Sequence, residues 1–158
     1  MAMAYGHVYV ARVAFGAKDV QTLKALQEAE SYHGPSLVIA YSHCIAHGYD
    51  MAYGCEQQKL AVDSGVWPLY RFDPRRIARS EPPLVVDSGP PKLSVREYMR
   101  NEARFRMVEK QDPERFRRLL AKAEHEARQR EAVYRELARL TLLPDPARAT
   151  PEPVGREQ

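Results

Sequence analysis

Long hydrophobic runs are missing from this sequence, and none approaches the roughly 18 residues that a membrane-spanning helix needs. The first residues, MAMAYGHVYVARV, lack a cationic start followed by an apolar stretch, so they do not resemble a secretory signal. Cysteine is also scarce: two in 158 residues do not make a disulfide framework. We therefore expect no membrane partner and a cytoplasmic location.

Charge of one sign is scarce too. The 24 lysines and arginines are interleaved with 21 aspartates and glutamates, and the net charge is only +3. A nucleic-acid surface would need a one-signed patch, so we expect no nucleic-acid partner. Acidic residues that precede basic ones by four positions, such as Glu131 and Arg135, indicate a solvent-exposed helix face instead.

Catalytic motifs are equally hard to find. The sequence contains no glycine-rich phosphate loop, no G-x-S-x-G elbow and no paired acidic motif in a plausible cleft. Hydrophobic residues nevertheless make up 44% of the chain, which is enough for one globular core with a small appendage.

The pattern of the N-terminal third predicts a strand, a helix and a second strand. Residues 8–13 (VYVARV) and 36–41 (SLVIAY) are apolar without alternation, which is typical of parallel strands that helices cover. Between them, Asp19 is a candidate N-cap and Gly34 a candidate left-handed C-terminal residue. The helical stripe expected to face the core consists of Val20, Leu23, Leu26 and Ala29 or Ala25.

The rest of the chain predicts fewer strands and more helix. A second helix should bury Leu60 and Ala61 and end at Gly65, before a short aromatic strand within VWPLYRFDP. The proline-rich residues 81–91 are typical of an extended connector. Ser94 with Glu97 forms a capping box, and Asp112-Pro113 is a helix start.

Cys44 lies just beyond the second predicted strand, where ligands gather in parallel sheets. Three interpretations of this thiol are open. It can be a packed, hydrophobic cysteine. It can belong to a zinc site with His47 and Cys55, and with His43 or His33 as fourth ligand. It can also be one ligand of a site whose other ligands lie outside this chain, since two cysteines cannot hold an iron–sulfur cluster alone.

Four separated motifs carry a resemblance to a known family: YGHVYVARVAFGA, GPSLVIAYSHCIAHG, QQKLAVDSGVWPLYRFDP and VREYMRNEARFRM. Over nearly the whole chain, the sequence resembles the carboxyl-terminal end of pyruvate:ferredoxin (flavodoxin) oxidoreductase. The resemblance implies an α/β fold, in which the C-terminal part of a thiamine-diphosphate-binding parallel sheet is followed by a helical extension.

Members of that family oxidatively decarboxylate pyruvate with coenzyme A. They use thiamine diphosphate with Mg and three [4Fe-4S] clusters, and ferredoxin or flavodoxin accepts the electrons. The resemblance implies that Cys44 is a ligand of the cluster nearest the thiamine. It also implies that His43 and His47 line the loop as hydrogen-bonding or packing groups, and it assigns nothing to Cys55.

The thiamine motif, a GDG followed by an asparagine-containing loop, is absent from this sequence, as are the partner cysteines. We therefore expect the chain alone to hold no cofactor and to be inactive, with upstream segments of the same enzyme as its partners. The expected parts are residues 1–80 (thiamine domain), 81–143 (connector and helical extension) and 144–158 (disordered tail). The alternatives are a free-standing, non-catalytic binding module or a small zinc-binding protein.

Overall fold

The apolar strand β1 (Tyr9–Val13) lies inside a four-stranded sheet of order β2-β1-β3-β4 in the computed structural model, which describes residues 1–143. It pairs in parallel with β2 (Ser36–Ala40) and antiparallel with β3 (Tyr70–Phe72). The last strand, β4 (Leu84–Val86), pairs antiparallel with β3. The predicted α/β class is confirmed, but the sheet is mixed, and β1 and β2 form its parallel pair.

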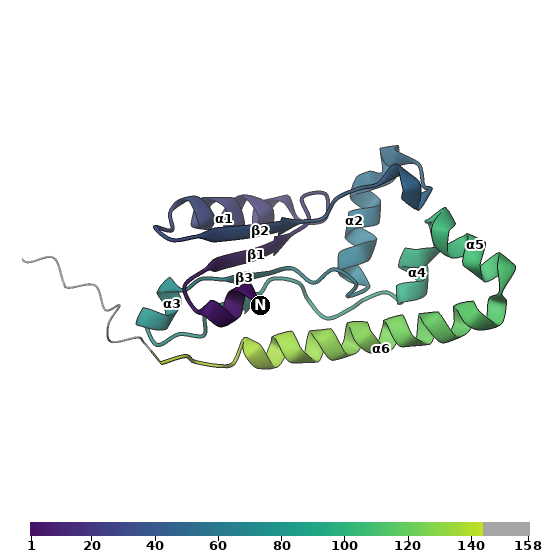
Figure 1. Cartoon of the computed structure of the whole chain (residues 1–158). Coiled ribbons are helices and arrows are strands. Elements are labelled where there is room, and N and C mark those ends of the chain that lie inside the picture. The colour runs from purple at the N-terminus through teal and green to yellow at the C-terminus, as the bar shows by residue number, and fades with distance from the viewer. Residues whose placement is uncertain (144–158) are drawn as a thin grey trace, which may run out of the picture.

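Helices cover the sheet and extend beyond one end of it. The helix α1 (Asp19–Glu30) joins β1 to β2, and the long α6 (Pro113–Leu137) runs along the opposite side (Figure 1).

The predicted tail, 144–158, lies outside the described residues. No helix within residues 1–143 is long and apolar enough to cross a bilayer. The remaining α-helices are α2 (Gly54–Asp63), α3 (Arg75–Ala78), α4 (Val95–Arg100) and α5 (Ala103–Gln111), and the 3-10 helices are η1 (Ala2–Tyr5), η2 (Ile45–His47) and η3 (Met51–Tyr53).

Side chains of β1 alternate between two hydrophobic clusters, because successive residues of a strand point to opposite faces. Tyr9, Ala11 and Val13 pack with Ala25 of α1. On the other face, Val10 joins a cluster that α6 and η1 cover. The members of this second cluster are Val10, Tyr70, Phe72 and Leu84, with Met3, Tyr134 and Ala138 packed against them.

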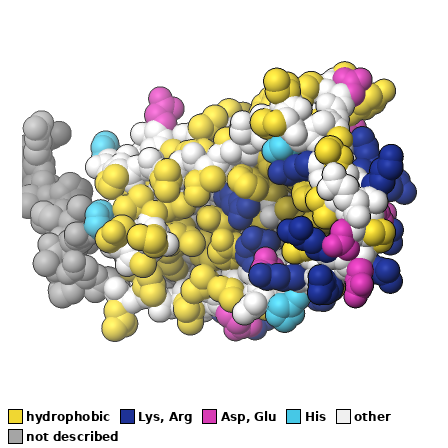
Figure 2. Space-filling view, turned by 45° about the vertical axis from the view of Figure 1, so that its right-hand side comes forward, with side chains coloured by type: hydrophobic (Ala, Val, Ile, Leu, Met, Phe, Trp, Pro, Cys, Tyr) yellow, Lys and Arg dark blue, Asp and Glu magenta, His cyan; other side chains and the backbone are white. Residues whose placement is uncertain are grey.

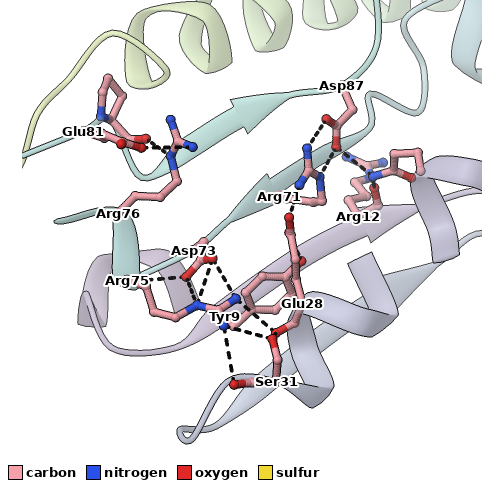
Figure 3. A network of polar contacts seen from close by, with 12 residues as sticks. Tyr9, Arg12, Glu28, Ser31, Arg71, Asp73, Arg75, Arg76, Glu81 and Asp87 are labelled. Atoms are coloured by element: carbon pink, nitrogen blue, oxygen red, sulfur yellow. Dashed lines mark hydrogen bonds and ion pairs between the residues drawn. The ribbon is translucent and has the colours of Figure 1, made fainter. Parts of the chain in front are cut away.

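A polar network centred on Arg71 joins α1 to the sheet (Figure 3). Its guanidinium donates from Nε and Nη2 to the two carboxylate oxygens of Asp87, at 2.8 Å each. Nη1 donates to Glu28, which also accepts a 2.9 Å hydrogen bond from the Tyr9 hydroxyl. Asp87 accepts a further bond from Gln21 of α1. The network therefore fixes which side of α1 faces the sheet.

The predicted inward stripe of α1 is wrong for its three large residues and correct for Ala25 and Ala29, which pack in the core. Val20, Leu23 and Leu26 are exposed, at 71%, 58% and 50%, whereas Gln21, Thr22 and Ala25 are buried. The bonds of Gln21 and Glu28 to Asp87 and Arg71 explain this rotation, because they require the polar side of the helix to face the sheet. Hydrophobic side chains cover much of the left-hand part of the face in Figure 2, and lysines and arginines gather on its right.

An exposed apolar edge was expected for the parallel pair, and β2 confirms it. It is the outer strand of the sheet, and its Leu37 and Ile39 are exposed. The proline-rich residues 81–91 also differ from a simple connector, since they contain β4. This strand has no clear signal in the sequence, because two prolines precede it, two more follow it closely, and its three residues show little periodicity.

Most of the helix boundary signals are confirmed. The Ser94–Glu97 capping box is present, and Asp112 accepts a hydrogen bond from the Arg115 amide at the start of α6. Gly65 has the left-handed conformation expected after α2, with φ of 74°. The α1 boundaries differ: Lys18 occupies the N-cap and Ser31 the C-cap, so Asp19 is the first helical residue and Gly34 lies beyond the helix.

Candidate functional site

Cys44 lies in the segment that follows β2, residues 41–53, which we call the cysteine loop. As predicted, this is the carboxyl end of a parallel strand. The Cys44 backbone is extended, with φ of −143° and ψ of 128°, and its carbonyl oxygen accepts the His47 amide at 3.0 Å. Its thiol is free and exposed. The cysteine is therefore presented outward by an ordered loop and is not packed in the core.

His43 is held by hydrogen bonds at both ring nitrogens. The Gly16 amide donates to Oε1 of Gln58, so the amide nitrogen of Gln58 faces Nε2 of His43, at 2.8 Å. Nε2 of His43 therefore accepts a hydrogen bond from the amide of Gln58. Nδ1 of His43 then carries the proton and donates it to the Tyr49 hydroxyl, at 2.5 Å. In this neutral tautomer, one ring nitrogen of His43 bonds Tyr49 of the loop and the other bonds Gln58 of α2.

Aromatic side chains form the base of the cysteine loop. The Tyr41 ring lies edge-on to Trp67, with centroids 5.3 Å apart, and its hydroxyl is 3.2 Å from that of Tyr98. Burial raises the pKa of both tyrosines, so both stay protonated at neutral pH. The indole nitrogen of Trp67 donates to the Val13 carbonyl at the end of β1. The loop is thereby connected to the ends of both parallel strands.

A buried carboxylate lies on the other side of the loop. Glu102, between α4 and α5, is fully buried, and its Oε1 accepts a 2.8 Å bond from Gln57 of α2. Its Oε2 accepts from Nε of Arg104 and lies 3.9 Å from Nδ1 of His47. This polar cluster joins the loop, α2 and the helical extension.

The structure separates the residues of the possible zinc site. His33 lies before β2 and Cys44 after it, so the strand, about 13 Å long at roughly 3.3 Å per residue, separates them. Cys55 is in the first turn of α2, against Gly16, and both nitrogens of His43 are hydrogen-bonded. Within residues 1–143, no three histidine, cysteine or acidic side chains are grouped so that they could hold a metal ion.

Sequence reasoning identified Cys44 and the two histidines but missed Gln57, Glu102 and Gly48. The burial of Glu102 leaves no periodic signal in the sequence, because only two residues, Asn101 and Glu102, separate α4 from α5. Gly48 could have been found, because a glycine that ends the SHCIAHG motif is typical of a left-handed turn, and its φ is 70°.

Comparisons with known proteins show that most of the chain is similar to members of one family. The chain is 56% identical over 149 residues to the pyruvate-flavodoxin oxidoreductase of Rhodospirillum rubrum, covering 94% of this chain. It is 47% identical over 138 residues to the pyruvate:ferredoxin oxidoreductase of Moorella thermoacetica, and 53% identical over 112 residues to a probable pyruvate-flavodoxin oxidoreductase of Escherichia coli. No protein-family model matches the chain.

The match covers only a small part of these relatives. The chain spans 12% of the length of the Rhodospirillum and Moorella proteins and 10% of the Escherichia coli protein. The resemblance that the four motifs indicate is therefore confirmed, as a match to one segment of a much longer enzyme.

Proposed function

We propose a role for this chain from the premise that it belongs to the pyruvate:ferredoxin (flavodoxin) oxidoreductase family, as a segment of such an enzyme. In this proposal, it acts in the CoA-dependent oxidative decarboxylation of pyruvate by completing one cofactor site. Residues 1–80 are, in this proposal, the C-terminal part of the thiamine-diphosphate domain, and residues 81–143 a connector and helical extension. The remaining segments of the enzyme supply the thiamine site and the other cluster ligands, and ferredoxin or flavodoxin is the electron acceptor.

Within this segment, we assign Cys44 as one ligand of the [4Fe-4S] cluster nearest the thiamine. The observation that carries the assignment is an exposed, free thiol on an ordered loop beyond the carboxyl end of β2. Such a thiolate can bind an iron whose other ligands come from other segments. The cluster, when bound, accepts and passes on single electrons. The task of this chain is to orient the thiolate, through the hydrogen bonds of His43 and the packing of Tyr41.

Alone, the chain should catalyse no acetyl-CoA formation from pyruvate, because its sequence has neither a thiamine motif nor enough cysteines for one cluster. The measurement is acetyl-CoA formation by the purified chain with pyruvate, thiamine diphosphate, Mg and coenzyme A. Product formation above the enzyme-free background would contradict the proposal.

The decisive test uses an intact family member that carries this segment in place of its own. Cys44→Ala should remove one cluster signal in electron paramagnetic resonance, lower the iron content by about four atoms and abolish pyruvate-dependent dye reduction. Cys55→Ala is the matched control and should leave all three unchanged. An unchanged cluster count in the Cys44 variant would end the ligand assignment.

A free-standing binding module is the second candidate, and the exposed apolar residues of α1 and β2 favour it. The coding sequence around this chain separates the two candidates. A neighbouring reading frame with the GDG motif and the missing cysteines supports the enzyme, whereas a gene without them supports the binding module.

A further inference from the structure

We propose that residues 98–104, at the α4–α5 corner, are the positioning element for the cysteine loop, and that the buried carboxylate of Glu102 is its anchor. The inference deepens the proposed function, because it rests on Cys44 being a cluster ligand for its functional consequence. Its structural basis is a set of contacts that hold the loop on both sides of Cys44.

The first contact is a backbone one, on the C-terminal side of Cys44. The Ala103 amide donates to the carbonyl oxygen of Gly48, at 2.9 Å. Gly48 has a left-handed φ of 70°, and a Cβ atom there would lie 2.6 Å from the Cβ of Ala103. A glycine is required at this position both for its conformation and for the close approach of the corner.

The second contact is on the N-terminal side of Cys44. The hydroxyl of Tyr41 pairs with that of Tyr98, which is the first residue of the corner. Tyr98 is buried, and its carbonyl oxygen accepts a 3.2 Å bond from Gln57. The two ends of the segment that contains Cys44, Tyr41 and Gly48, are thus held by residues 57 and 55 positions later in the chain.

Glu102 fixes the position of the corner relative to α2. Its two oxygens accept from Gln57 and from Arg104, at 2.8 and 2.5 Å, and Gln57 in turn accepts from Asn101 at 3.3 Å. A buried carboxylate is unfavourable unless each oxygen is satisfied, so α2 and the corner cannot slide past each other without losing these bonds. An apolar contact of the same area would tolerate such sliding. Since α2 also holds His43 through Gln58, the position of Cys44 depends on the corner.

The test of positioning uses the 158-residue chain in a Cys55→Ser background, with a nitroxide spin label on Cys44. Glu102→Ala should free the loop, so the lines of the nitroxide spectrum should become narrower. The hydrogen exchange rate of the Ala103 amide should rise at least about tenfold. Glu102→Gln, which keeps the shape and one acceptor, should restore most of the protection. The matched control is Glu109→Gln, which breaks an exposed ion pair with Arg96 on the neighbouring helices and should change neither signal.

The functional arm places the same variants in an intact family member that carries this segment. Glu102→Ala should shift the reduction potential or the g-values of one cluster while the iron content stays constant, and Glu102→Gln should shift them less. If Glu102→Ala does not fold, Arg104→Gln, which removes the partner of Oε2, replaces it with the same expectations.

The two proposals fail separately. An unchanged cluster count in Cys44→Ala removes the ligand assignment, while the spin label and the exchange rate still report whether the corner holds the loop. Spectra and exchange rates of Glu102→Ala that match those of Glu109→Gln overturn the positioning role. If Glu102→Ala makes the spin label more mobile but leaves the reduction potential and g-values of the cluster unchanged, the corner positions the loop without affecting the cluster, and the functional part of the proposal is wrong.

Discussion

Replacing Arg71 with methionine should strongly destabilise the fold, because it leaves two carboxylates without their cation. The side chain of Arg71 is 10% exposed, and its partners Asp87 and Glu28 are 10% and 22% exposed. The hydrogen bond to Asp87 also raises the pKa of the guanidinium, so the cation persists at any accessible pH.

Removal of one partner from a buried ion pair costs about 3–5 kcal/mol. Glu28 would keep the Tyr9 hydroxyl and Asp87 the Gln21 amide, so we expect a loss near the lower limit, about 3 kcal/mol. The length of the methionine side chain preserves most of the packing. Adding Asp87→Asn to Arg71→Met removes one of the two unpaired charges and should restore at least about 1 kcal/mol.

Equilibrium unfolding in urea measures these losses, with the fluorescence of Trp67 as the signal, since it is the only tryptophan and its indole bonds to the end of β1. Measurements over about a tenfold range of protein concentration separate unfolding from self-association. Arg139→Met is the control, because its ion pair with Glu136 is largely exposed and worth at most about 1 kcal/mol. If Arg71→Met costs no more than Arg139→Met, the network does not stabilise the fold as we infer.

Three further predictions concern pH, the loop glycine and the outer face of α1. Burial raises the pKa of Tyr70 to about 12, above the ordinary value of 10.0, so its stabilising effect is complete below pH 10 and is lost as the pH rises towards 12. Between pH 10 and 12, the free energy of unfolding of Tyr70→Phe should therefore fall by about 2–3 kcal/mol less than that of the parent chain. If the unfolding free energies of the two proteins change in parallel with pH, the prediction is wrong. In the same urea assay, Gly48→Ala should lower the free energy of unfolding clearly more than Gly6→Ala. Both glycines have a left-handed φ, but of the two only Gly48 faces a side chain within 4 Å. Equal losses would mean that Ala103 moves aside without cost. Changing Val20, Leu23 and Leu26 together to glutamine should lower the self-association of the chain in sedimentation velocity, since all three are exposed apolar residues, and an unchanged distribution would remove α1 from the contact.

Local signals in the sequence were sufficient where the structure depends on neighbouring residues. The Ser94–Glu97 capping box and the Asp112 N-cap were predicted correctly because each depends on atoms within three residues of one another. The apolar runs that became β1 and β2 were also correct as strands. A non-alternating run predicts a strand buried on both faces, which fits β1, whereas β2 is the outer strand and most of its residues are exposed.

Errors arose where residues distant in sequence decide the outcome. Periodicity showed that Val20, Leu23 and Leu26 share a face of α1, but not which way that face points. Asp87 and Arg71, which lie 66 and 43 positions after Gln21 and Glu28, reversed it by bonding these two residues on the other side of the helix. The same applies to Glu102, whose burial depends on Gln57 of a different helix.

The orientation of α1 has a consequence for the site itself. The polar face of the helix is used to bond the sheet, so the apolar side chains that ordinarily stabilise such a unit lie outside, and Leu37 and Ile39 of the outer strand β2 add further exposed apolar surface. In an enzyme about eight times the length of this chain, we expect other segments to cover that surface. Cys44 lies shortly after the same strand. If it is a cluster ligand, as we propose, contacts that cover β2 would also bring the other ligands towards the cysteine loop. The α4–α5 corner contacts the cysteine loop within this chain, so the positioning that we propose for Cys44 would not depend on those segments.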